Sequence, residues 1–115
     1  MPFTESALNI GADAVAAASR WVSAHTGDPG SSGVNEVAGG SYARQQTTYP
    51  SAASGDSTGS QVVIPIPAAT SVTHWGLWSA SSGGTFRGGF ALGATEVFGV
   101  AGNLNHTPTL DADPV

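Results

Sequence analysis

One candidate for a catalytic residue in this chain is a serine inside a short glycine motif. Gly55-Asp56-Ser57-Thr58-Gly59 matches G-x-S-x-G, the pattern that presents a nucleophilic serine on a sharp turn between a buried strand and a helix. A hydrolase would also place a histidine within about 3.2 Å of the Ser57 hydroxyl. A polar Ser/Ala/Gly segment precedes Ser57 and a strand-like segment follows it, so we reject this nucleophile and predict no catalytic residues.

The three histidines are the next candidates. His25, His74 and His106 are the only ones in the chain, and none has a second ligand at a spacing typical of metal sites. Asp28 follows His25 within a turn, where an aspartate more often accepts backbone hydrogen bonds than binds a metal. His74 lies in an expected strand and is interpreted as a packed residue. We therefore predict no metal ion and no cofactor.

The three tryptophans allow two interpretations. Trp21, Trp75 and Trp78 could form a platform on which sugar rings stack, or they could supply core and interface mass. The second interpretation is favoured. The first predicts an exposed Trp75 or Trp78 in a shallow groove, and glycan binding that is lost on Trp→Ala substitution.

Length and charge limit the possible partners. The chain has 115 residues, no cysteine and a net charge of −5, which indicates one domain over residues 1–115. It has no lysine and only three arginines, so it is poorly suited to a nucleic-acid backbone. No apolar run approaches the roughly 20 residues of a membrane span, and no targeting segment is apparent. We therefore expect synthesis in the cytoplasm, no membrane partner, and a homo-oligomer whose weakly charged surface is covered by other chains.

Hydrophobic spacing predicts one short helix followed by six or seven short strands. Leu8, Val15 and Val22 repeat every seven residues, which predicts a helix over residues 5–18. This helix would be either an arm that docks on a neighbouring subunit or a cap on the domain's own sheet. The closely spaced turns that follow predict an antiparallel β-sandwich or barrel. We expect the strands at residues 21–25, 41–49, 61–67, 71–79, 85–92, 95–101 and 104–110.

A long loop over residues 26–40 contains the densest turn chemistry. In Asp28-Pro29-Gly30, the proline presets φ for a type II turn and the glycine accepts the positive φ that follows. Loops of this length inside compact domains tend to be functional or mobile. The loop is therefore either a contact or ligand loop or a long connection between strands.

The clearest hairpin joins residues 71–79 to residues 85–92 through a glycine-ended turn. Alternation places Phe86, Phe90 and Leu92 on one face of the second strand. We expect Gly76 and the Gly88-Gly89 pair to mark a bulge, or a place where a tryptophan ring covers bare backbone. A further turn is expected at Gly102-Asn103.

Some residues are expected to contact other chains. Pro65 and Pro67 lack ladder donors and so mark an edge. The acidic tail over residues 111–115 has no core pattern and needs a partner outside its own fold to hold it. Our predicted protein–protein interface set is Leu8, Val15, Trp21, Pro65, Pro67, Asp111 and Asp113.

Three stretches together carry a family resemblance. HTGDPGSSGVNEVAGGSYARQ, VTHWGLWSASSGGTFRGGFAL and GNLNHTPTL resemble small structural proteins of tailed bacteriophages, usually labelled tail-fibre or minor structural proteins. The resemblance covers residues 20–110 and implies no catalysis. It also implies that Glu36 and Arg44 fix the loop as an ion pair. The full loop-fixing motif is Asp28, Pro29, Gly30, Glu36, Tyr42 and Arg44.

The resemblance implies a virion protein made in the host bacterial cytoplasm and present in many copies. Its partners would be major capsid or tail proteins. Capsid decoration is slightly favoured over a minor tail or tail-fibre role, because the chain has neither the repeats nor the long coiled shaft of a fibre. The alternative is a module of the tail that binds host carbohydrate.

Overall fold

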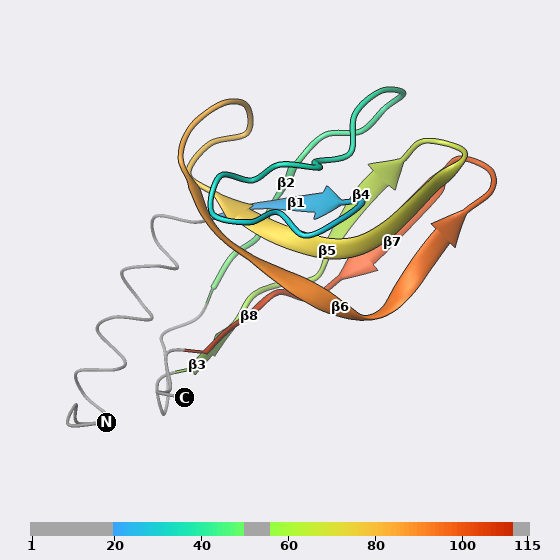
Figure 1. The fold of residues 1–115 in the computed structure, drawn as a ribbon. Coiled ribbons are helices and arrows are strands. Elements are labelled where there is room, and N and C mark those ends of the chain that lie inside the picture. Colours follow the sequence, from blue (N-terminus) through green and yellow to red (C-terminus); the bar gives the residue numbers. More distant parts are fainter. Residues whose placement is uncertain (1–19, 50–55, 112–115) are drawn as a thin grey trace.

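The described part of the chain is an antiparallel β structure (Figure 1). The computed structural model describes residues 20–49 and 56–111. The expected mainly β, antiparallel fold is confirmed, and the described residues form eight strands in place of the six or seven short strands expected. No helix in these two ranges is long and apolar enough to cross a membrane. The strands are β1 (Trp21–His25), β2 (Gln45–Gln46), β3 (Asp56–Thr58), β4 (Val62–Ile66), β5 (Thr70–Trp78), β6 (Phe86–Phe98), β7 (Gly102–His106) and β8 (Thr109–Asp111).

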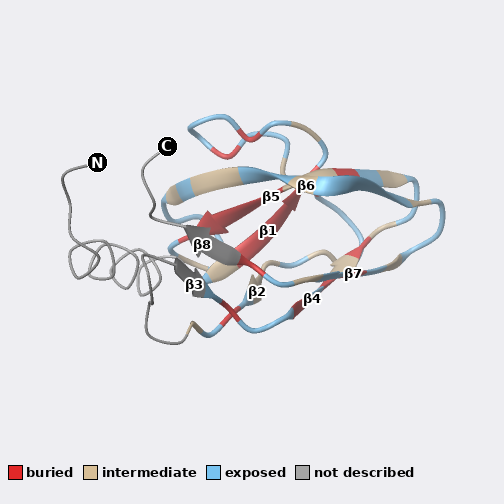
Figure 2. Cartoon of the chain, turned by 90° about the horizontal axis from the view of Figure 1, so that it is seen from below, coloured by how far each residue is buried: buried red, intermediate tan, exposed pale blue. Residues whose placement is uncertain are grey.

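The strands form two layers around one core. A four-stranded sheet has the order β2-β1-β5-β6, while β4 pairs with β7 and β3 pairs with β8. Figure 2 shows β4 and β7 in a layer separate from β5 and β6. Strand β4 alternates as predicted, with Val62, Ile64 and Ile66 buried and Val63 half exposed. The core side chains are Val22, Ala24, Val37, Val62, Ile64, Ile66, Val72, Trp75, Leu77 and Leu104.

Strand β6 is longer than the sequence suggested. Segments 85–92 and 95–101 were expected as two strands, but residues 86–98 form a single strand. Ala91 pairs with His74 of β5, and the next residue of β6 that pairs with β5 is Glu96. Residues 92–95 therefore have no partner in β5. The chain then turns over residues 99–101. Gly102 and Asn103, the expected turn, instead begin β7.

A bulge near the start of β6 reverses which face its side chains occupy. The register slips between Leu77↔Gly88 and Trp78↔Phe86, so a bulge lies next to the expected glycines. The Phe86 ring therefore lies beside Gly76, whereas Phe90 stacks on Trp75 at a centroid distance of 4.6 Å. The prediction that Phe86 and Phe90 share a face is wrong, because the extra residue of the bulge moves the side chains that follow it to the opposite face of the sheet.

Two further expectations are corrected. Only Gln45–Gln46 of the predicted strand 41–49 pairs with β1. The start of the predicted strand is a turn instead, in which the Tyr42 amide donates to the Gly39 carbonyl. The polar segment 51–60 contains strand β3, which pairs with β8. Asp111 therefore belongs to a strand and not to a tail. The predicted helix 5–18 and residues 112–115 lie outside the described residues.

Candidate functional site

The loop over residues 26–40 packs against the side of the large sheet that faces away from the core. We call this side the outer face; it carries Ser23 and His25 of β1, Gly76 and Trp78 of β5, and Phe86 of β6. Buried Pro29 lies against Gly89 of β6, and a Cβ atom at Gly33 would lie only 2.5 Å from Cζ2 of the Trp78 ring. The loop therefore covers the outer face in direct contact, as a long connection with a packing role.

The turn at the start of this loop has the expected chemistry. Gly30 has a φ of +62°, and its amide donates to Asp28 Oδ1 at 2.9 Å. Asp28 thus accepts a backbone hydrogen bond, as predicted. The Pro29 carbonyl accepts from the amides of Gly33 (2.9 Å) and Val34 (3.1 Å), which closes the turn and directs Pro29 onto the sheet.

A chain of hydrogen bonds lies under the loop and uses a serine and a histidine that are both fully buried. Trp78 Nε1 donates to Ser23 Oγ at 2.9 Å, Ser23 Oγ lies 2.7 Å from His25 Nε2, and His25 Nδ1 lies 2.9 Å from the Val34 carbonyl oxygen. A carbonyl only accepts, so Nδ1 carries the proton and Nε2 accepts from the Ser23 hydroxyl. Neutral His25 therefore ties β1 to the loop.

The ion pair expected between Glu36 and Arg44 is present and has two bonds. Arg44 Nε donates to Glu36 Oε2 at 2.8 Å, and its terminal nitrogen NH2 donates to Oε1 at 2.9 Å. The other terminal nitrogen donates to the carbonyls of Ala80 and Gly83, both at 2.9 Å. One guanidinium therefore connects the loop to the turn between β5 and β6.

Two aromatic residues complete this cluster. The Arg44 guanidinium carbon lies 3.7 Å from the Trp78 ring centroid, a stacked cation–π arrangement. The Tyr42 hydroxyl donates to Glu36 Oε2 at 2.7 Å and accepts from the Ala24 amide at 3.1 Å. Burial alone would raise the pKa of Glu36, but the hydrogen bonds from Arg44 and Tyr42 and the Arg44 charge outweigh it and lower that pKa. The carboxylate is thus ionised and engaged in structure.

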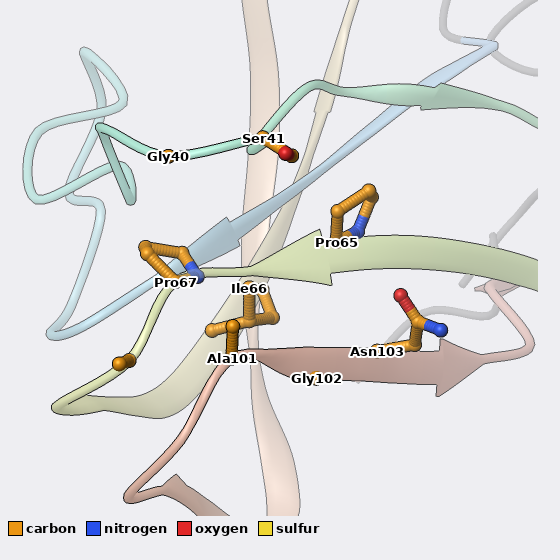
Figure 3. A pocket seen from close by; sticks show the side chains of 9 residues that line it. Gly40, Ser41, Pro65, Ile66, Pro67, Ala101, Gly102 and Asn103 are labelled. Carbon is orange, nitrogen blue, oxygen red and sulfur yellow. The ribbon is translucent and has the colours of Figure 1, made fainter.

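Two hollows open beside these elements. One has a volume of about 420 Å³ and is bordered by Glu36, Tyr42, Arg44 and the Ser81-Ser82 turn. The other, of about 470 Å³, has no charged residue in its lining. Figure 3 shows Pro65 and Pro67 in this second hollow, between the Gly40-Ser41 segment and the start of β7.

The predicted interface residues are only partly brought together. Pro65 and Pro67 share the uncharged hollow. Trp21 is half-buried at the start of β1, opposite Trp78 and Gln46. Leu8, Val15 and Asp113 lie outside the described residues. The role of these residues in a protein–protein interface therefore stays a prediction.

The structure also bears on the catalytic and the sugar-platform alternatives. Ser57 lies in strand β3, opposite residue 110 of β8, so its backbone does not form the strand-to-helix turn of a nucleophile elbow. Trp75 and Trp78 are only 6% and 9% exposed, so the alternative of an exposed sugar platform built on them is wrong, and the favoured interpretation of the two as packed residues is confirmed. Within residues 20–49 and 56–111, no three His, Cys, Asp or Glu side chains gather as a metal site would require.

Comparison with known proteins identifies a family. A family model described as Podophage GP4 fiber I protein gp80 matches residues 6–105, which is most of the chain. The matched range includes the 26–40 loop, the Glu36–Arg44 pair and the β5–β6 hairpin. No curated protein matches the chain.

Replacing Arg44 by lysine tests the ion-pair cluster. Lysine keeps the charge but loses the two-bond fork to Glu36 and the paired bonds to the Ala80 and Gly83 carbonyls. We expect Arg44→Lys to lower the free energy of unfolding by about 2–3 kcal/mol, measured by urea denaturation. Arg20→Lys is the matched control, because Arg20 is exposed. Equal and small losses in both variants would contradict a structural role for Arg44.

The buried histidine predicts that stability falls in mild acid. Burial lowers the pKa of His25 below its ordinary value of 6.5, against opposing contributions from the Val34 carbonyl and Glu36. The unfolded chain therefore binds a proton that the folded chain resists, so unfolding free energy is constant above pH 6.5 and decreases as the pH falls below it. His106, whose pKa is also lowered by burial, adds a term of the same sign.

The His106→Gln variant separates the two histidines. Denaturation of this variant between pH 7.5 and pH 5 should retain a pH-dependent loss of stability, and the NMR resonances of the His25 ring should titrate below pH 6.5. A His25 ring that titrates at or above pH 6.5 in the folded protein would contradict the burial described here.

Proposed function

Because the chain belongs to the podophage GP4 fiber I protein family, and is thus a structural protein of a tailed-phage virion, we propose that it is a non-enzymatic fibre module present in several copies. The family match over residues 6–105 carries this proposal. The sequence, with neither repeats nor a long coiled shaft, slightly favoured capsid decoration. The family's description names a fibre, so the tail is now the favoured location.

The engagement of the reactive side chains supports a role without catalysis. Among the side chains that the structure describes, the one serine hydroxyl that hydrogen-bonds a histidine belongs to Ser23, and both Ser23 and His25 are 0% exposed. The hydroxyl donates to His25 while accepting from Trp78, so it is occupied on both sides. A substrate could reach this pair only after the 26–40 loop left the sheet.

The close fit of the loop supports a structural role. The Val37 amide of the loop donates to the Ala24 carbonyl of β1, and within the loop the Thr26 amide donates to the Asn35 carbonyl, each at 2.9 Å. The Arg44 cluster attaches the same loop to the far end of the β5–β6 hairpin. A rigid module of this kind suits a structural subunit of a larger assembly better than a protein that closes around a small ligand.

Purified phage particles test this function. We expect quantitative mass spectrometry to find the protein in virions in several copies, and gold-labelled antibodies to mark the tail in electron micrographs. Absence of the protein from purified particles would overturn the virion role. Label on the capsid shell would retain the virion role and reject the fibre location.

A further inference from the structure

The tip of the 26–40 loop lies on the outer face through few contacts. We call this tip, residues 27–34, the strap. Only Pro29 and Gly33 of its eight residues are buried; the first lies against β6 and the second against the Trp78 ring of β5. The other residues of the strap are exposed or half-buried. Segments with few buried contacts open at a lower free energy than the core of a domain.

Internal hydrogen bonds hold the shape of the strap without help from the sheet. The amides of Gly33 and Val34 both donate to the Pro29 carbonyl, at 2.9 and 3.1 Å. Among the described residues, the only hydrogen bond between the strap and the sheet runs from His25 Nδ1 to the Val34 carbonyl, at 2.9 Å. The strap can therefore leave the sheet as a formed turn, with the loss of this one bond.

The chain on either side of the strap is attached more firmly. The Thr26 amide donates to the Asn35 carbonyl, and the Val37 amide donates to a carbonyl of β1, each at 2.9 Å. Val37 is also part of the buried core, and the Arg44 cluster holds the chain next to it. The bond between Thr26 and Asn35 therefore marks a hinge at the base of the strap.

The hydrogen bonds under the strap fit only a neutral His25. Its Nε2 accepts from Ser23 Oγ, which accepts in turn from Trp78 Nε1. A second proton on the ring would make Nε2 a donor. Ser23 Oγ would then face two donors, and among the described residues it has no third hydrogen-bond partner to take its own proton. The closed arrangement therefore loses a buried hydrogen bond when His25 becomes charged.

The surroundings of the His25 ring also oppose a charge. Burial is the largest influence and lowers the pKa of His25. Glu36 of the loop raises that pKa, whereas Arg44 and His74 lower it, and His74 lies directly opposite His25 on β5. Strand β6 contributes the uncharged Phe86 ring, which lies edge-on with the ring centroids 6.0 Å apart. A charged His25 therefore needs water, which the strap excludes.

We propose that the strap is an acid-released cover: protonation of His25 frees residues 27–34 from the outer face, about the hinge at Thr26 and Asn35, while the sheet and the Arg44 cluster keep their structure. The strap stays docked above pH 6.5, the ordinary pKa of histidine. Below it the open form gains up to about tenfold per pH unit, because the open form binds a proton that the closed form resists. Release exposes the Trp78 ring and the serine–histidine pair.

Hydrogen exchange of the Trp78 indole N–H, followed by NMR on the full chain, tests the proposal. This proton bonds to Ser23 Oγ beneath the strap. Its protection, relative to N-acetyl-tryptophanamide at the same pH, should fall about tenfold between pH 7.5 and pH 5.5. At pH 5.5 its exchange should not depend on urea below the unfolding transition, because release of the strap exposes little surface.

The hinge is tested in the same spectra. The amides of Thr26 and Val37, and those in the centre of the β1–β5 ladder, should exchange more slowly than the indole at pH 5.5. Their exchange should quicken with urea, because it requires the exposure of much more surface.

Glutamine variants identify the group that takes up the proton. His25→Gln keeps a neutral polar side chain that does not titrate in this range, so the pH dependence of the indole protection should disappear. His106→Gln is the matched control on β7 and should retain the tenfold fall. His74→Gln should retain it too, because His74 influences His25 only through its charge. If His25→Gln does not fold, the urea dependence of the wild type and these two variants decide the proposal.

Four results would overturn the proposal. The first is indole exchange that follows the ladder amides in its urea dependence at every pH, because the proton would then be exposed only by global unfolding. The second and third are a fall that persists in His25→Gln and a fall abolished by His74→Gln or His106→Gln. The fourth is a loss of protection at Thr26 and Val37 together with the indole, because the whole 26–40 loop would then leave the sheet.

Discussion

The position of Trp78 is the constraint on which the rest of the outer face depends. Its indole nitrogen bonds to Ser23, its ring supports the Arg44 guanidinium, and its edge meets Phe86 and the backbone at Gly33. Each contact joins Trp78 to a different part of the chain. A large aromatic side chain on the solvent side of a sheet needs a cover, and the 26–40 loop provides it.

Bare backbone makes this cover possible. A Cβ atom at Gly76 would lie 2.8 Å from the Phe86 ring and 2.9 Å from both His25 Nε2 and Ser23 Oγ. At Gly89 the same atom would collide with Pro29. The two glycines therefore let a ring and a proline approach the sheet closely, so the loop and the sheet form one packed unit. The contact is large enough to enclose a neutral serine–histidine pair.

Local patterns in the sequence predict those features that depend on a few neighbouring residues. The Asp28-Pro29-Gly30 turn, the alternation in β4 and the placement of β1 and β5 follow from spacing alone. The same reasoning fails at β6, because a bulge changes the parity that separates Phe86 from Phe90. It also fails for the Ser23–His25–Trp78 chain, because residues 55 positions apart meet only once the β1–β5 register is known. Ser23, His25, Gly76 and Trp78 do alternate on facing positions of two strands, and this was the available signal.

Amide hydrogen exchange tests the central claim, that the 26–40 loop stays docked on the sheet as part of one rigid unit. If it does, the amides of Thr26, Gly33 and Val37, which bond to Asn35, Pro29 and Ala24, should exchange about as slowly as amides in the centres of β1 and β5. Fast exchange at these three amides beside a protected β1–β5 ladder would show a loop that opens independently, and would contradict the account.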